Sequence, residues 1–130
     1  MGGRRGIIRL WIDMNSVGVD IIEVGRIQRA IGRWGERFLV RVFTPAELEL
    51  CRRKPASLAA RFAAKEAVMK ALGGAQRWQE IEVLRGPGGE PRLRLLGRAR
   101  ARARRLGLEL VVSLSHCREY AIASVIGSRR

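Results

Sequence analysis

Two acidic residues are the strongest candidates for chemistry in this sequence. Asp20 interrupts the apolar, β-branched run from Val17 to Ile22, where a carboxylate gains nothing from packing. Glu66 lies in the segment 57–72, and if the fold brings it beside Asp20, the two carboxylates repel each other unless a cation lies between them. Two protein carboxylates, completed by water and substrate phosphates, are a usual arrangement for Mg²⁺ in phosphoryl chemistry. Such a pair would suit a phosphoryl-transfer site, capping of the following helix by Asp20 is the structural alternative, and the spacing does not decide between the two.

The segment 57–72 carries more charge than a buried helix should. On a helical wheel its large apolar side chains and its alanines leave no continuous polar face, which predicts a helix covered on both sides. Arg61 and Lys65 nevertheless fall inside the large apolar arc, while Glu66 and Lys70 lie together at its edge. These charges either belong to a functional site, or they pair along the helix and extend toward the surface. The wheel alone does not decide between the two.

A third candidate lies where the alternating run Ser113–His116 ends. His116 is the one histidine of the chain and directly follows Ser115. A lone histidine is more often a structural residue than a catalyst. With a neighbouring hydroxyl and abundant arginines, this corner is nevertheless suited to binding a phosphate.

The elements that position these residues come in the order strand, three helices, two strands, helix and two strands. Strands are expected at 17–22, 81–85, 92–96, 109–115 and 120–126, and helices at 23–41, 44–53, 57–72 and 98–106. Gly32 and Gly35 weaken the first helix or divide it in two. Thr44–Glu47 predicts a capping box with proline in the first turn. This order predicts a single α+β domain with helices packed on a mainly antiparallel sheet.

The composition excludes several classes of protein. The chain has 130 residues, of which 47% are hydrophobic and 29% charged, so intrinsic disorder is not expected. No apolar run reaches the roughly 20 residues that a membrane-spanning helix needs. Cys51 and Cys117 are too few for a disulfide framework and lack metal-ligand spacing, which favours a reducing, cytoplasmic setting. Residues 1–15 differ in composition from the rest, and we expect a loosely ordered extension before a domain at 16–130.

The charge balance points to an anionic partner. There are 26 lysines and arginines against 12 acidic residues, a formal net charge of +14. Such a protein attracts nucleic acid, anionic membrane, phosphorylated ligands or acidic proteins. A non-catalytic basic module that binds nucleic acid or an acidic protein is therefore the alternative to an enzyme. The chain has only three Trp, three Phe and one Tyr, with no aromatic cluster on a basic strand, which argues against nucleic acid.

Four segments taken together resemble the holo-[acyl-carrier-protein] synthases, the small trimeric class of 4'-phosphopantetheinyl transferases. They are GVDIIEVGRI at 18–27, RFAAKEAVMKALG at 61–73, the W-x-x-I-E-V pattern at 78–83 and VSLSHCREYAIASVI at 112–126. The resemblance continues in register over nearly all of residues 16–127. It implies an α+β transferase of fatty acid biosynthesis that moves 4'-phosphopantetheine from coenzyme A to a serine hydroxyl of an apo acyl carrier protein. Adenosine 3',5'-bisphosphate is the implied second product.

The resemblance also implies roles for individual residues. Asp20 and Glu66 match the Mg²⁺ ligands of the family, and Glu66 is also a candidate for taking the serine proton. Lys70 matches a lysine that stabilises the leaving phosphate. The positions implied to lie near coenzyme A are Arg61, Lys65, Gly73, Ser115 and His116.

Assembly and docking follow from the same resemblance. Sites of this family lie at trimer interfaces, so we expect a homotrimer in which His116 contacts the 3'-phosphate from a neighbouring subunit. An acidic carrier protein is expected to dock on arginines that match Arg26, Arg33 and Arg37. The loop 73–77 is shorter than the glycine-containing loop usual in the family. A subunit that keeps the fold without catalysis is a further alternative, although neither implied metal ligand is missing.

Overall fold

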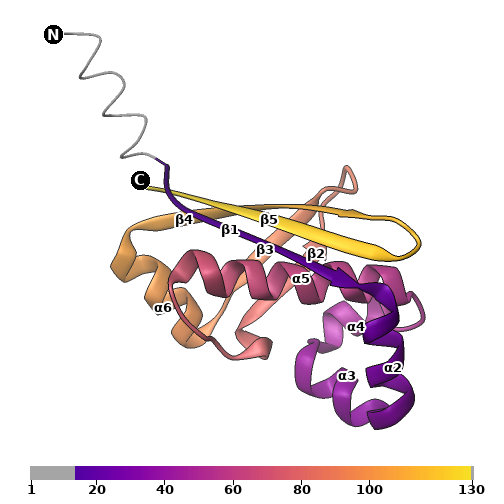
Figure 1. Ribbon diagram of the computed structural model, residues 1–130. Helices are drawn as coiled ribbons and strands as arrows, with labels where there is room; N and C mark the ends of the chain where they lie inside the picture. Colours follow the sequence, from indigo (N-terminus) through magenta and orange to yellow (C-terminus); the bar gives the residue numbers. More distant parts are fainter. Residues whose placement is uncertain (1–13, 130) are drawn as a thin grey trace, which may run out of the picture.

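The protein, described by a computed structural model over residues 14–129, combines helices with two antiparallel sheets (Figure 1). Its helices are α2 (Val24–Trp34), α3 (Glu36–Val42), α4 (Pro45–Cys51), α5 (Pro55–Leu72) and α6 (Gly97–Leu106), with a 3₁₀ turn η1 (Trp78–Glu80). Its strands are β1 (Met14–Glu23), β2 (Ile81–Arg85), β3 (Pro91–Leu95), β4 (Leu108–His116) and β5 (Tyr120–Arg129). This arrangement confirms the predicted α+β fold.

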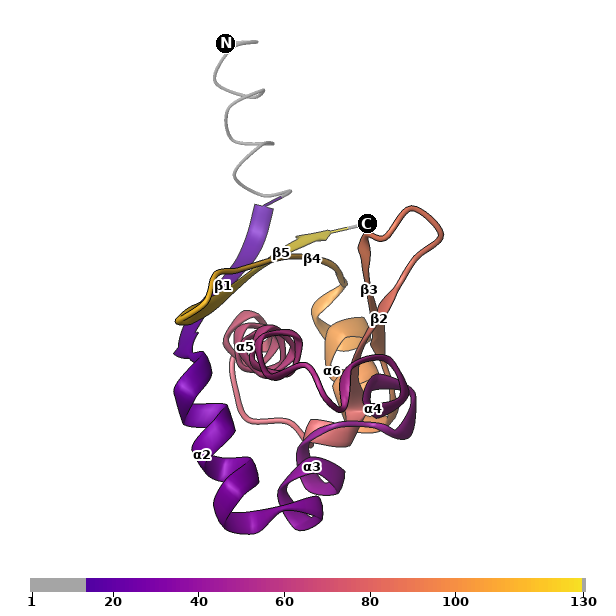
Figure 2. The same cartoon turned by 90° about the vertical axis from the view of Figure 1, so that its right-hand side faces the viewer.

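The elements surround one central helix. Three strands form an antiparallel sheet in the order β1-β5-β4, and β2 and β3 form a separate antiparallel hairpin. α5 lies across one face of the three-stranded sheet, and Figure 2 shows the hairpin and α6 on its other side. α2, α3 and α4 gather at the N-terminal end of α5 (Figure 1).

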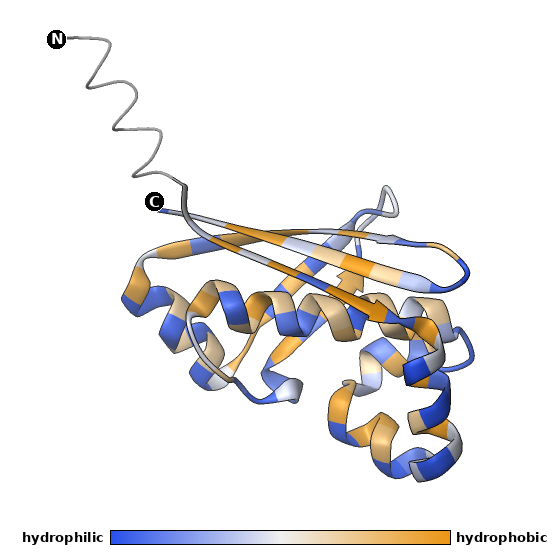
Figure 3. Ribbon diagram, in the orientation of Figure 1, coloured by the Kyte–Doolittle hydropathy of each residue, from blue (hydrophilic) through white to orange (hydrophobic). Residues whose placement is uncertain are grey.

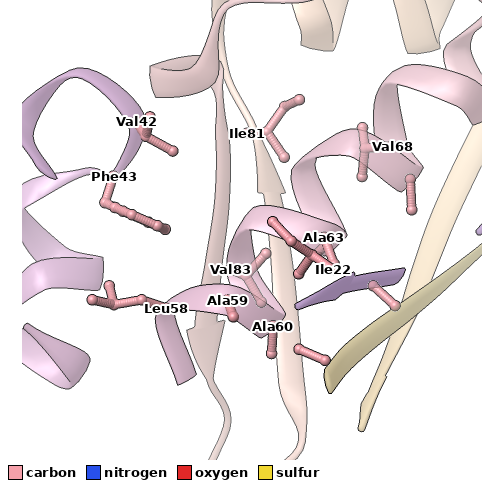
Figure 4. Close-up of a cluster of buried hydrophobic side chains, with 14 of the residues drawn as sticks. Ile22, Val42, Phe43, Leu58, Ala59, Ala60, Ala63, Val68, Ile81 and Val83 are labelled. Carbon is pink, nitrogen blue, oxygen red and sulfur yellow. The ribbon is translucent and has the colours of Figure 1, made fainter. Parts of the chain in front are cut away.

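α5 is buried on both sides because small side chains let its neighbours approach closely. Six alanines of this helix are at most 6% exposed: Ala59, Ala60, Ala63, Ala64, Ala67 and Ala71. In the buried cluster of Figure 4, Ala59 and Ala63 share the core with larger side chains such as Phe43, Ile81 and Val83, which are fully buried. Removing a large apolar side chain of this kind from water contributes about 1.5–3 kcal/mol to folding. The predicted two-sided burial of this helix is confirmed.

Local signals set several boundaries as predicted, with one correction. Gly35 has a φ of 55° and separates α2 from α3. The capping box forms at α4, where Thr44 N donates to Glu47 Oε1 over 2.9 Å and Glu47 N donates to Thr44 Oγ1 over 3.2 Å. β1 begins at Met14, two residues inside the predicted extension, because β5 is long enough to pair with it at Ser128. Residues 1–13 of that extension lie outside the described residues.

Candidate functional site

β1 brings Asp20 to the turn of α5 that carries Glu66. Because Gly18 has no side chain, β1 lies directly against α5, where an added Cβ would stand 1.9 Å from the carbonyl oxygen of Ala67. Two residues further along β1, Asp20 Oδ1 lies 3.1 Å from Lys70 Nζ. Glu66 precedes Lys70 by one helical turn, so both side chains lie on the same side of α5. The structure thus brings Asp20 and Lys70 together, with Glu66 on the same side of α5.

Glu66 and Lys70 do not pair along α5, and Asp20 does not cap the helix that follows β1. Lys70 pairs with Asp20 and also donates to Val19 O over 2.9 Å. The Glu66 side chain forms no hydrogen bond or ion pair with any residue in the described range 14–129. Asp20 lies within β1, and the N-cap residue of α2 is Glu23. Asp20 therefore does not cap the helix, and Glu66 stays available to a ligand.

The two carboxylates fit a Mg²⁺ ion that takes its remaining ligands from water and substrate. The Lys70 ammonium, which is half exposed, already compensates part of their charge. Across the part of the chain that the structure describes, no group of three or more His, Cys, Asp and Glu side chains could hold a metal. Mg²⁺ is usually held by one or two carboxylates plus phosphates rather than by an all-protein cage. Asp20 and Glu66 match that requirement in number and in donor type.

Arg61 and His116 lie together elsewhere, between α5, β4 and the hairpin. With Arg85 they line a cavity of about 200 Å³. The Arg61 guanidinium is held in place because its Nε donates to Val83 O over 2.9 Å. Arg61 precedes Glu66 by five residues, which places it about 140° around the helix axis. The cationic cavity and the carboxylate site therefore lie on opposite sides of α5.

Ser115 and Gly73 do not line that cavity. Alternation along β4 turns Ser115 to the face of the sheet opposite to His116. Gly73 ends α5 in the left-handed conformation with a φ of 79° and is exposed three residues beyond Lys70. Of the residues implied to lie near coenzyme A, the structure brings only Arg61 and His116 into one cavity of a single chain.

The structure does not place Lys65 in the cavity that Arg61 and His116 line. The Lys65 side chain is fully buried and its ammonium lies 2.7 Å from Glu47 Oε1. It also donates to Val42 O over 2.8 Å and to Trp78 O over 2.9 Å. Burial lowers the pKa of Lys65, and the Glu47 carboxylate partly opposes this decrease. The wheel could not reveal this, because the anionic partner comes from another helix.

A groove that the sequence analysis missed borders the predicted docking arginines. It measures about 480 Å³, and among its lining residues are Trp34, Phe38, Phe62 and Trp78, with Arg37 and Arg41. The rings of Phe62 and Trp78 stack with centroids 5.0 Å apart. Arg26, Arg33 and Arg37 are all exposed, and Arg33 lies 5.0 Å from the centroid of the Trp34 ring. The aromatic residues come from four elements, so no local sequence pattern would have grouped them.

The face of the three-stranded sheet turned away from α5 is apolar, and no other element within residues 14–129 covers it. Orange residues recur along β1 and β5 in Figure 3. Seven large side chains on this face are 40–62% exposed: Val17, Val19, Ile21, Val111, Tyr120, Ile122 and Ile126. Ser115 lies on the same face, since it pairs with Ile122, which pairs with Ile21. An exposed face with this many large apolar side chains marks an interaction surface.

Comparisons of the sequence and of the structure with known proteins point to the same family. Residues 16–125 match the 4'-phosphopantetheinyl transferase superfamily. The holo-[acyl-carrier-protein] synthase of Dehalococcoides mccartyi is 59% identical over 116 residues, which cover 87% of this chain and 98% of that protein. The same enzyme of Moorella thermoacetica is 58% identical over 117 residues, covering 85% and 91%. The solved Helicobacter pylori holo-[acyl-carrier-protein] synthase in complex with coenzyme A has a TM-score of 0.78 at 32% identity, covering 86% of this chain and 99% of that one.

Proposed function

This chain belongs to the 4'-phosphopantetheinyl transferase superfamily and is a transferase of the holo-[acyl-carrier-protein] synthase type, and from that premise we propose a Mg²⁺-dependent reaction. It transfers 4'-phosphopantetheine from coenzyme A to a serine hydroxyl of an apo acyl carrier protein and releases adenosine 3',5'-bisphosphate. The observation that carries this proposal is the placement of Asp20, Glu66 and Lys70 on one side of α5.

The proposed step is a substitution at phosphorus. The serine oxygen bonds to the pantetheine-bearing phosphorus, the phosphoanhydride bond breaks, and its electron pair leaves with adenosine 3',5'-bisphosphate. Bound between Asp20 and Glu66, Mg²⁺ would neutralise charge on the pyrophosphate. Lys70 is free to turn from Asp20 to the leaving phosphate because its side chain is 55% exposed. Glu66 accepts the serine proton, directly or through water.

We further propose that a complete site needs a second copy of the chain, in a homotrimer. Arg61 and His116 lie across α5 from Asp20 and Glu66, so their cavity faces away from the carboxylates of their own chain. The uncovered apolar face of the sheet supplies a surface through which copies can associate. In this assembly His116 of one protomer binds the 3'-phosphate of the coenzyme A that lies at its neighbour's Asp20 and Glu66 site.

The carrier protein is proposed to dock on α2 and α3. Arg26, Arg33 and Arg37 supply the positive charge that an acidic partner requires, and Arg41 adds to it at the rim of the aromatic groove. We place the reaction in the cytoplasm, in keeping with two cysteines that are both free thiols. No helix within residues 14–129 is long and apolar enough to cross a membrane.

Intact mass spectrometry of an apo acyl carrier protein tests the proposal. The carrier is incubated with this protein, coenzyme A and Mg²⁺, beside a matched sample with EDTA and a carrier whose acceptor serine is replaced by alanine. We expect a mass gain of one phosphopantetheine that EDTA and the serine replacement both abolish. No gain with any of several carrier proteins would contradict the proposed reaction, and a gain that survives EDTA would contradict its metal requirement.

A further inference from the structure

A buried ion pair lies directly beneath the aromatic groove. Lys65 and Glu47 are both fully buried, with the ammonium 2.7 Å from Glu47 Oε1. The other two N–H groups of Lys65 donate to the carbonyl oxygens of Val42 and Trp78. An ammonium has three donors, and all three are used inside the chain. Lys65 has no hydrogen-bond donor left for a ligand.

Both carboxylate oxygens of Glu47 are also hydrogen-bonded inside the chain. Its Oε1 accepts from Thr44 N over 2.9 Å, and its Oε2 accepts from Val83 N over 2.9 Å. The pair therefore links the start of α4, the end of α3, η1 and β2 to the middle of α5. Removing two charges from water is costly, and apolar residues of similar volume often stabilise a core as well or better. Stability alone is a poor explanation for this ion pair.

The acceptors of Lys65 suggest its role. Val42 and Trp78 both line the groove, and Phe62, which stacks on Trp78, precedes Lys65 by three residues on α5. The Lys65 ammonium is thus hydrogen-bonded to residues from two walls of the groove, Val42 and Trp78. Phe62, from a third wall, lies one helical turn away from Lys65. The next residue along α5 is Glu66. Two adjacent residues of α5 therefore serve the two sites: Lys65 makes the buried hydrogen bonds beneath the groove, and Glu66 supplies a carboxylate of the proposed metal site.

We infer that Lys65, neutralised by Glu47, is a positioning residue that holds α3, η1 and α5 at the spacing on which the carrier protein docks, and that it does not contact coenzyme A. This inference rests on the proposed function for the identity of the partner. The geometry that carries it is the full set of buried hydrogen bonds around the ammonium.

Lys65→Met removes the ammonium while keeping a long apolar side chain. Lys54→Met is the matched control, because it makes the same substitution at an exposed position just before α5. We expect Lys65→Met to raise the KM for the carrier protein about tenfold through the loss of two buried hydrogen bonds, with the KM for coenzyme A nearly unchanged. Lys54→Met should change neither constant. A higher KM for coenzyme A with an unchanged KM for the carrier would overturn the inference.

The double variant Lys65→Met/Glu47→Gln separates positioning from stability, and it also carries the test if Lys65→Met does not fold. It removes the orphaned buried carboxylate, so part of the lost resistance to urea should return. The KM for the carrier should stay high, because the carbonyls of Val42 and Trp78 still lack their donor. Recovery of stability and KM together would show a merely structural role and refute the inference.

Amide hydrogen exchange gives a readout that does not depend on activity. In Lys65→Met we expect faster exchange over residues 36–42 and 78–80 than in Lys54→Met. Unchanged exchange in both segments would refute the inference even if wild-type protein modified no carrier. Wild-type protein that fails to modify any carrier, with exchange accelerated as expected, would instead refute the proposed function while the positioning role stands.

Discussion

Gly18 and Ala67 are in such close contact that a Cβ on Gly18 would stand 1.9 Å from the carbonyl oxygen and 2.9 Å from the carbonyl carbon of Ala67. The atoms it would meet are backbone atoms of a helix buried on both sides, which have little room to move. This contact sets the depth at which β1 lies on α5. Since Asp20 follows Gly18 by two residues and Glu66 precedes Ala67, it also sets the distance between the two carboxylates.

Gly18→Ala is therefore expected to damage both stability and activity. The added methyl group must push β1 away from α5, at a cost of about 2–3 kcal/mol in the free energy of unfolding. The same shift should lower transfer about 100-fold, because it displaces Asp20 from Glu66. Urea unfolding and the carrier mass assay measure the two effects. Gly32→Ala is the control: nothing lies within 4 Å of its Cβ position in α2, so it should be neutral or stabilise by up to about 1 kcal/mol.

The secondary structure could be predicted from the sequence because its signals are local. The capping box at Thr44–Glu47 and the stop at Gly73 each depend on a few neighbouring residues. Asp20 could be singled out as a candidate because a carboxylate in a β-branched run has no packing role. Its contact with Lys70 spans 50 residues, and no periodicity predicts such a distance.

The features that the sequence could not predict share one physical origin. The wheel placed Lys65 in an apolar arc but could not show whether its ammonium met a ligand or a buried carboxylate. Glu47, its actual partner, looked like a capping residue alone, although its carboxylate performs both functions. The apolar run Val17–Ile22 likewise does not reveal that one of its two faces is left uncovered by residues 14–129.

Removing either carboxylate should disrupt metal-dependent transfer. Asp20→Asn and Glu66→Gln keep side-chain size but replace a charged metal ligand with a neutral one. We expect each to lower the transfer rate about 100-fold or more. Calorimetric titration of Mg²⁺ into the protein with coenzyme A provides a readout besides activity, in which both variants should show weaker binding. Glu23→Gln, an exposed carboxylate at the end of the same strand, is the control. Near-normal transfer and Mg²⁺ binding in either site variant would remove that residue from the metal site.

A charge on the uncovered sheet face should break the assembly without unfolding the chain. Ile21 is 62% exposed in a single chain, so Ile21→Lys is tolerable in a monomer but not inside an apolar interface. Light scattering should report the mass of a monomer in place of a trimer, and transfer should be lost while circular dichroism stays unchanged. Leu50→Lys, on α4 and away from the sheet, should keep the trimer. A trimer that survives Ile21→Lys would locate the interface elsewhere.

Reversing a docking charge should affect the carrier protein more than coenzyme A. Arg26→Glu on α2 is expected to raise the KM for the carrier about 5- to 10-fold and to weaken its dependence on salt, with the KM for coenzyme A unchanged. Arg100→Glu makes the same charge change at an exposed position on α6 and should leave both constants unchanged. An equal effect of the two variants would show that only net charge matters, and that α2 is not a specific docking site.

The buried lysine predicts how stability depends on pH. Burial lowers the pKa of Lys65 in the folded protein below the ordinary value of 10.5, so the unfolded chain keeps this proton to a higher pH. Between the folded pKa and 10.5 the unfolded state binds more protons, and this group's contribution to stability rises with pH. The free energy of unfolding of wild-type protein, relative to that of Lys65→Met, should therefore increase as pH approaches 10.5, measured by urea unfolding at a series of pH values. For Lys54→Met, which changes an exposed lysine, the difference in the free energy of unfolding from wild-type protein should not rise over this pH range. A difference for Lys65→Met that is flat or falls across this range would mean that Lys65 keeps its proton in the folded protein as readily as in the unfolded chain.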